Sequence, residues 1–178
     1  MPVHYRAWTD VTGRFGLVFP EDRFYSLGGV PTIKIAQLLI DEQGQGRQLD
    51  AHAMTEAKEA AFLLHFEEVQ PIAPVVEIAR RCREAGPVAI ASGGSRAMVE
   101  RTLRHIGLWD WFPVVVAAED TTRHKPEPDV FLEAARRLAV SPSICTVYED
   151  TDLGLEAARR AGMKGFDVRP LYPARRSA

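Results

Sequence analysis

The chain has 178 residues, of which 46% are hydrophobic and 26% are charged. These proportions are ordinary for a folded domain and exclude a disordered, collagen-like or low-complexity chain. The formal net charge of −2 gives no electrostatic reason to expect nucleic-acid binding. No apolar run approaches the roughly 18 residues that a membrane-spanning helix needs, and the start of the chain has no signal-peptide core. Two cysteines are too few for a disulfide framework, so we expect a reducing, cytoplasmic setting.

Residues 1 to about 70 are predicted to be helical throughout. Apolar side chains recur every three or four positions, which is typical of amphipathic helices, and Asp50 is placed to cap the last helix. Between the first two helices, Gly28-Gly29-Val30-Pro31 breaks the pattern and predicts a shaped loop. The expected helices span residues 4–15, 32–42 and 50–68.

After Pro71, short and continuously apolar strands alternate with helices. This rhythm is typical of an α/β fold with a parallel sheet that is covered on both faces. The expected strands span residues 88–91, 114–117, 144–148 and 165–168, and the expected helices span 74–85, 95–106, 129–138 and 153–161. Because ligands of such sheets bind at the carboxyl ends of the strands, the residues after each strand are the candidates for function.

The first strand is followed by Ser92-Gly93-Gly94-Ser95-Arg96 and then by a helix. A hydroxyl and glycines at a helix start suit a phosphate, because the free N–H groups and the helix dipole point at the ligand. The alternative is an ordinary turn in which Ser95 caps the helix.

The next two strand ends carry charged residues. Lys125 stands before a proline-rich helix start, where its ammonium group can neutralise a phosphate or a carboxylate, or simply be exposed. The last of the three strands leads into Glu149 and Asp150, which repel each other unless a cation such as Mg²⁺ joins them. An acidic helix cap at Asp152 is the alternative. Together, the hydroxyl loop, the lysine and the acidic pair suit Mg²⁺-assisted phosphoryl transfer.

Three stretches resemble the haloacid dehalogenase-like hydrolase superfamily, and within it the branch of beta-phosphoglucomutase and the sugar-phosphate phosphatases. They are residues 88–96, 125–131 and 148–163. The resemblance implies a Rossmann-like core at residues 71–178 and a helical cap domain at residues 1–70. It also implies a small phosphorylated metabolite, such as a sugar phosphate, as the substrate.

The resemblance further implies roles for individual core residues. Ser92 and the Gly93 N–H would hold the phosphate, with Gly94 and Arg96 beside them. Lys125 would bridge the nucleophile and the phosphate. Asp150 would bind Mg²⁺, and Glu149 would either ligate the ion or support it from behind. These roles are expectations from the family and not from spacing.

In the cap, the resemblance gives substrate-binding roles to further residues. His4 and Lys58 match residues that position the general acid/base in the mutase, and Gly28-Gly29 matches the specificity loop. Thr32 stands where the mutase carries an arginine for a second phosphate, which favours a phosphatase over a mutase. Lys34 either meets the sugar or is a solvated helix lysine.

The family's first motif, an apolar strand followed by Asp-x-Asp-Gly, does not occur in this chain. Asp10-Val11-Thr12-Gly13 imitates it, but this stretch lies in a predicted helix and has one aspartate. In the family that first strand is central, between the strands expected here at 88–91 and 144–148. We therefore expect the chain to be a shortened form of a phosphatase, and to be inactive in this form.

Two alternatives remain beside the phosphatase. One is a non-catalytic remnant of the family that binds a phosphorylated ligand or a protein. The other is nucleic-acid binding by paired arginines, although glutamates near three of the pairs indicate ordinary solvated helix faces. The pairs are residues 80–81, 136–137, 159–160 and 175–176.

Overall fold

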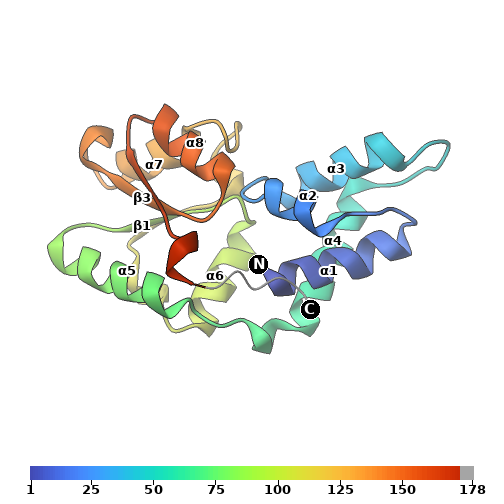
Figure 1. The fold of residues 1–178 in the computed structure, drawn as a ribbon, viewed down its shortest axis with the longest axis horizontal. Helices are drawn as coiled ribbons and strands as arrows, with labels where there is room; N and C mark the ends of the chain where they lie inside the picture. Colours follow the sequence, from blue (N-terminus) through green and yellow to red (C-terminus); the bar gives the residue numbers. More distant parts are fainter. Residues whose placement is uncertain (173–178) are drawn as a thin grey trace.

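The computed structural model describes residues 1–172, which form a helical lobe and an α/β lobe (Figure 1). The helical lobe holds α1 (Pro2–Arg14), α2 (Glu21–Ser26), α3 (Thr32–Gln43) and α4 (Ala51–Leu64). Three of these helices confirm the predicted ones, whereas α2 was not predicted. Its six residues are too few for an apolar repeat to show.

The core of the helical lobe forms where α1, α3 and α4 meet. Trp8 and Phe62 are the largest of its fully buried side chains. The Asp50 carboxylate accepts a hydrogen bond from the His52 N–H at 2.9 Å and caps α4, as predicted. This lobe has its own hydrophobic cluster, which extends from Ala7 to Phe66.

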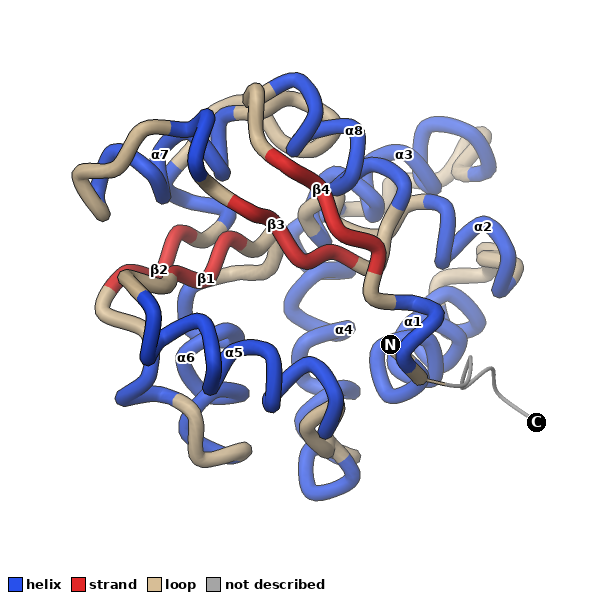
Figure 2. Tube along the Cα trace, turned by 60° about the vertical axis from the view of Figure 1, so that its left-hand side comes forward, coloured by secondary structure: helices blue, strands red, loops and turns tan. Residues whose placement is uncertain are grey.

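The α/β lobe contains four short parallel strands in two pairs. The strands are β1 (Ala89–Ala91), β2 (Val114–Val116), β3 (Thr146–Glu149) and β4 (Lys164–Asp167). β1 pairs with β2 and β3 pairs with β4, so the described residues form two two-stranded sheets. Figure 2 shows them side by side in the order β2, β1, β3, β4. The predicted strand at 144–148 begins later because residues 142–144 form a 3₁₀ turn that starts at a proline.

Four helices accompany these strands: α5 (Ala73–Ala85), α6 (Arg96–His105), α7 (Asp129–Arg137) and α8 (Asp152–Arg160). Figure 2 places α7 and α8 on one side of the strands and α5 and α6 on the other. The second hydrophobic cluster lies on the α7 and α8 side and runs from Val116 to Met163. By contrast, α5 has no buried residue.

Surface charge on the described residues is largely paired. Arg80, Arg136 and Arg159 each bind a glutamate three residues earlier on the same helix, at 2.7–2.9 Å. The predicted pair at 175–176 lies outside the described residues. Among residues 1–172, no helix is long and apolar enough to cross a membrane.

Candidate active site

A cavity of about 390 Å³ lies between the two lobes, at the carboxyl ends of β1 and β3. Eleven of the residues singled out in the sequence line it: His4, Gly28, Gly29, Thr32, Lys58, Ser92, Gly93, Gly94, Lys125, Glu149 and Asp150. Three of them follow three different strands, which is the convergence that the sequence predicts. Lys34, Arg96 and Asp10 are not among the lining residues, and Lys34 and Asp10 are exposed.

Lys125 and Glu149 form a buried ion pair at the floor of the cavity. The Lys125 ammonium donates to Glu149 Oε2 at 2.6 Å, and the two side chains are only 6% and 9% exposed. The ammonium also lies 4.8 Å from the centre of the Phe131 ring. Burial alone raises the pKa of Glu149, but the Lys125 charge and hydrogen bonds from Thr151 and the Asp150 N–H outweigh it and hold that pKa below its usual value.

The other Glu149 oxygen is also fully engaged. Glu149 Oε1 accepts from the Thr151 hydroxyl at 2.8 Å and from the backbone N–H groups of Asp150 and Thr151 at 3.1 and 3.2 Å. Thr151 in turn caps α8 by accepting from the Gly154 N–H at 3.0 Å. Since all of its donors are internal, Glu149 supports the site from behind and leaves Asp150 as the carboxylate that faces the cavity.

Asp150 has a different electrostatic environment from its neighbour. Its pKa is raised, first by burial and then by the adjacent charge of Glu149. The Tyr172 hydroxyl donates to Asp150 Oδ2 at 3.3 Å. Among residues 1–172, no group of three or more His, Cys, Asp or Glu side chains is arranged to hold a metal ion. Asp150 is therefore a single carboxylate donor.

The helical lobe contributes His4 and Lys58 to the opposite wall. His4 Nδ1 lies 3.0 Å from the Lys58 ammonium, and its ring stacks on Phe62 with 4.0 Å between centroids. Burial, and then the charges of Lys58 and the chain's amino terminus, lower the pKa of His4 well below its usual value. Burial lowers the pKa of Lys58 to about 8. A neutral imidazole beside a readily deprotonated ammonium therefore faces the cavity.

The lowered pKa of Lys58 gives a prediction about stability. Between about pH 8 and its ordinary pKa of 10.5, the unfolded chain binds more protons at this position than the folded one, so the stability of the wild type rises with pH. We expect Lys58→Met to be more stable than the wild type at pH 7, by on the order of 2–3 kcal/mol, and this advantage to shrink by pH 10. Urea unfolding at both pH values measures it, with Lys164→Met at an exposed lysine as the control. An advantage that stays constant with pH contradicts the prediction.

Glycines bring the two lobes together above the phosphate loop. A Cβ on Gly93 would lie 2.1 Å from the Gly29 carbonyl oxygen, and Gly29 itself has a φ of +89°. A Cβ on Gly28 would lie 2.5 Å from the Thr151 methyl group. A side chain at any of these positions would separate the lobes or strain the loop. The Ser95 hydroxyl adds a link by donating to Glu59 Oε1 at 2.9 Å.

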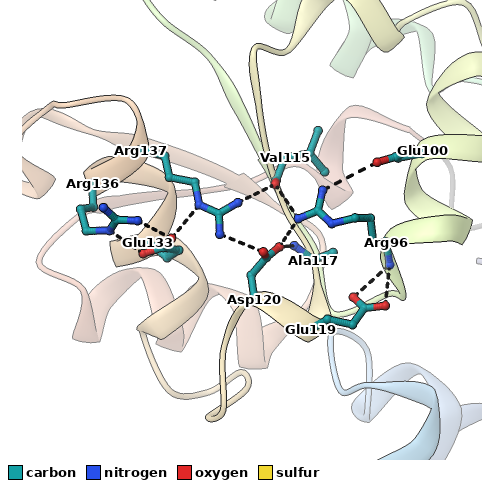
Figure 3. Close-up of polar contacts among 9 residues, drawn as sticks. All are labelled: Arg96, Glu100, Val115, Ala117, Glu119, Asp120, Glu133, Arg136 and Arg137. Atoms are coloured by element: carbon teal, nitrogen blue, oxygen red, sulfur yellow. Dashed lines mark hydrogen bonds and ion pairs between the residues drawn. The ribbon is translucent and has the colours of Figure 1, made fainter.

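Arg96 lies in a charge network behind the phosphate loop (Figure 3). Its guanidinium binds Asp120, and the second carboxylate oxygen of Asp120 accepts from Arg137 at 2.8 Å. Both guanidiniums also donate to the Val115 carbonyl at 3.3 Å. The Arg96 side chain thus ties the start of α6 to the end of α7, and the structure does not bring it to the cavity.

Comparison with known proteins places this site in a family. The family model for haloacid dehalogenase-like hydrolases matches residues 1–162. The chain belongs to this family. This haloacid dehalogenase-like hydrolase is 41% identical over 171 residues to the fructose-1-phosphate phosphatase YqaB of Escherichia coli K12, an alignment that covers 96% of the chain and 89% of the relative.

Solved structures show the same fold. A hydrolase from Pseudomonas syringae has a TM-score of 0.82 at 21% identity, and the match covers 97% of this chain and 80% of that one. The beta-phosphoglucomutase of Clostridium difficile has a TM-score of 0.79 at 22% identity, with 92% and 75% covered. These neighbours confirm the predicted α/β, Rossmann-like fold of the hydrolase.

Three contributions to the hydrolase site were missed in the sequence. Thr151 and Gly154 shape the carboxylate of Glu149, and Tyr172 reaches Asp150 from the far end of the described chain. A threonine three residues before a glycine at a helix start is a capping signal that was assigned to Asp152 instead. No local pattern marks Tyr172, because its contact depends on the tertiary fold.

Proposed function

We propose that this chain contributes the substrate-binding cap and most of the catalytic core of a Mg²⁺-dependent phosphatase for small phosphorylated metabolites, with sugar phosphates as the first candidates. The observation that carries the proposal is the meeting of Ser92, Lys125 and Asp150 on one cavity, since each follows a different strand. Hydroxyl and N–H donors, a cation and a metal-binding carboxylate are the groups that phosphoryl transfer requires. The name of the Escherichia coli relative, fructose-1-phosphate phosphatase, supports the choice of substrate class.

The residues present fit a magnesium ion in part. Asp150 faces the cavity as a hard oxygen donor whose raised pKa reflects an uncompensated negative charge. Mg²⁺ commonly binds one or two carboxylates and completes its shell with water and substrate phosphate oxygens. When bound there, the ion supplies positive charge against the phosphate oxygens. Glu149 fits the supporting role, because its oxygens are held by Lys125, Thr151 and backbone N–H groups.

The proposed reaction uses a carboxylate nucleophile. The carboxylate attacks phosphorus, the ester P–O bond breaks, and the departing alkoxide takes up a proton. Water then hydrolyses the acyl phosphate, which releases phosphate and returns the carboxylate. Ser92 and the Gly93 N–H would hold the transferring oxygens, and Lys125 would balance their charge. Glu149 and Asp150 are the only carboxylates that line the cavity among the described residues, and both have other roles.

We therefore expect the 178-residue chain to bind phosphate esters without turning them over. Phosphate release from a panel of hexose, hexitol and pentose phosphates, with and without Mg²⁺, should stay at background, while calorimetry should detect binding of the same esters. Lys125→Met should abolish the binding, and Arg123→Met, a few residues away on the exposed surface, should retain it. Metal-dependent turnover by this chain would show that another nucleophile operates.

A second candidate is a non-catalytic protein that binds a phosphorylated ligand. It is favoured by the same observation, that no third carboxylate faces the cavity within residues 1–172. The two candidates differ in one result. Supplying a carboxylate at the strand ends should create turnover if the site is a phosphatase, and should leave binding alone if it is not.

A further inference from the structure

The strands β1 and β3 each have one edge that is not paired with another strand. The Ser92 N–H donates to the Val116 carbonyl at 2.9 Å, so alternate residues of β1 direct their backbone groups toward β2. The backbone groups of Ala89 and Ala91 consequently face away from β2. By the same alternation Thr146 and Tyr148 face away from β4, because the Val168 N–H donates to the Glu149 carbonyl at 3.0 Å.

These two edges lie toward each other in the order β2, β1, β3, β4 (Figure 2). In the part of the chain that the structure describes, β1 and β3 do not pair with each other. Ile90, Ala91 and Tyr148 line the same cavity. We call the space bounded by Ala89, Ala91, Thr146 and Tyr148 the β1–β3 slot. Backbone N–H and C=O groups that remain unpaired away from water destabilise a fold, so the slot favours an added strand.

The apolar residues around the slot are poorly covered. α5 is amphipathic, yet Val75, Val76 and Ile78 are only half-buried and the helix buries nothing fully. No residue of β1 is buried, and Tyr148 of β3 is 40% exposed. On the other side of the strands, α7 buries four of its nine residues. The contrast indicates that an apolar occupant is needed between the strands and α5.

Direction and charge define the occupant further. The residues that follow β1 and β3, Ser92 and Asp150, line one cavity, so both strands end at the same side. A strand parallel to both would bring its C-terminal end beside Lys58 and Lys125. The Lys58 ammonium hydrogen-bonds a neutral imidazole there and not a carboxylate. A carboxylate at the C-terminal end of the occupant therefore complements the charge of the site.

We propose that the β1–β3 slot binds an extended apolar peptide segment in trans, parallel to both strands and with an aspartate at its C-terminal end. The binding is strand addition, in which main-chain hydrogen bonds supply affinity and the alternating side chains fill the space under α5. The choice of aspartate rests on the proposed phosphatase function, whereas the binding of a strand does not.

The test uses a fluorescein-labelled peptide with two lysines for solubility, then five β-branched or aromatic residues, then aspartate. Anisotropy against the 178-residue chain should show saturable binding with a Kd on the order of 10 µM or tighter. N-methylation of the alternate amides that face β1 removes main-chain donors and should weaken binding at least tenfold. A peptide of reversed sequence, with aspartate first, should also bind at least tenfold more weakly.

Hydrogen exchange locates the bound peptide and needs no variant of the protein. Ala89, Ala91, Thr146 and Tyr148 should gain protection when the peptide is added, while amides of α1 to α4 should not. In a fusion protein, the same segment placed ahead of Met1 through a flexible linker should raise the Tm and block the free peptide, because Met1 lines the same cavity. Equal binding of the N-methylated peptide, or protection confined to other regions, overturns the proposal.

The slot and the phosphatase function fail in different ways. If the peptide binds and protects the slot but the complex hydrolyses no phosphate ester with Mg²⁺, the slot stands and the proposed function is wrong. If no saturable binding is found while the fused form hydrolyses phosphate esters, the function stands and binding in trans is wrong.

Discussion

Replacing Lys125 by methionine should destabilise the fold by about 3–5 kcal/mol, because the change leaves the buried carboxylate of Glu149 without its cation. Methionine keeps the length and apolar stem of the side chain, so the loss reports on charge and hydrogen bonding and not on a cavity. The Lys125 ammonium lies 2.6 Å from Glu149 Oε2, and both side chains are at least nine-tenths buried, so water cannot replace it. Urea unfolding at pH 7 measures the effect.

The loss should depend on pH in a defined direction. In the wild type the pKa of Glu149 is lowered, so its contribution is present at neutral pH and is lost as the pH falls through that pKa. In Lys125→Met, burial without the cation raises this pKa, and protonation on acidification relieves the unpaired charge. The two stabilities should therefore approach each other as the pH falls from about 7 to about 4. A gap that widens in acid contradicts the assignment.

Two variants control for the loss of a lysine-sized cation. Arg123→Met removes an exposed ion pair to Asp129, 3.0 Å long with the arginine 67% exposed, and should cost less than about 1 kcal/mol. The double variant Lys125→Met with Glu149→Gln removes both charges and should recover part of the loss, since no buried ion remains. If the double variant is as unstable as Lys125→Met alone, the unpaired carboxylate is not the cause.

The sequence predicts the site residues well where function and secondary structure coincide. Ser92, Lys125 and Asp150 follow strands of a parallel sheet, and the geometry of such sheets brings strand ends together without further information. The α/β fold follows from the same alternation. Lys58 was placed in the cavity wall only through the family resemblance, since one lysine on an alanine-rich helix gives no signal of burial.

The contacts between lobes could not be predicted in the same way. Gly93 against Gly29, and Ser95 against Glu59, join residues that are 36 or more positions apart. Arg96 illustrates the opposite error, because its place in the phosphate loop suggested a ligand contact. The structure commits its guanidinium to Asp120 and the Val115 carbonyl, and a local pattern carries no information about such distant partners.

Gly154→Ala should also destabilise the fold strongly, by about 3 kcal/mol or more. A Cβ at this position would lie 2.1 Å from Glu149 Cδ and 2.3 Å from Oε2. Overpacking alone costs about 1–3 kcal/mol, and here the displaced group is the carboxylate that pairs with Lys125 and accepts from Thr151. Thermal or urea unfolding measures the change, and Gly13→Ala, in a helix with open space at the Cβ, should instead stabilise by about 0.5–1 kcal/mol.

The decisive comparison removes the carboxylate that the new methyl group would meet. In a background that carries Lys125→Met and Glu149→Ala, the buried pair is absent and a Cβ at residue 154 has room. Because alanine is a better helix former than glycine by about 1 kcal/mol, Gly154→Ala should then become neutral or stabilising. A reversal of sign between the two backgrounds requires direct coupling between residues 149 and 154. If the substitution costs the same in both, the glycine serves the α8 backbone and not the seat of Glu149.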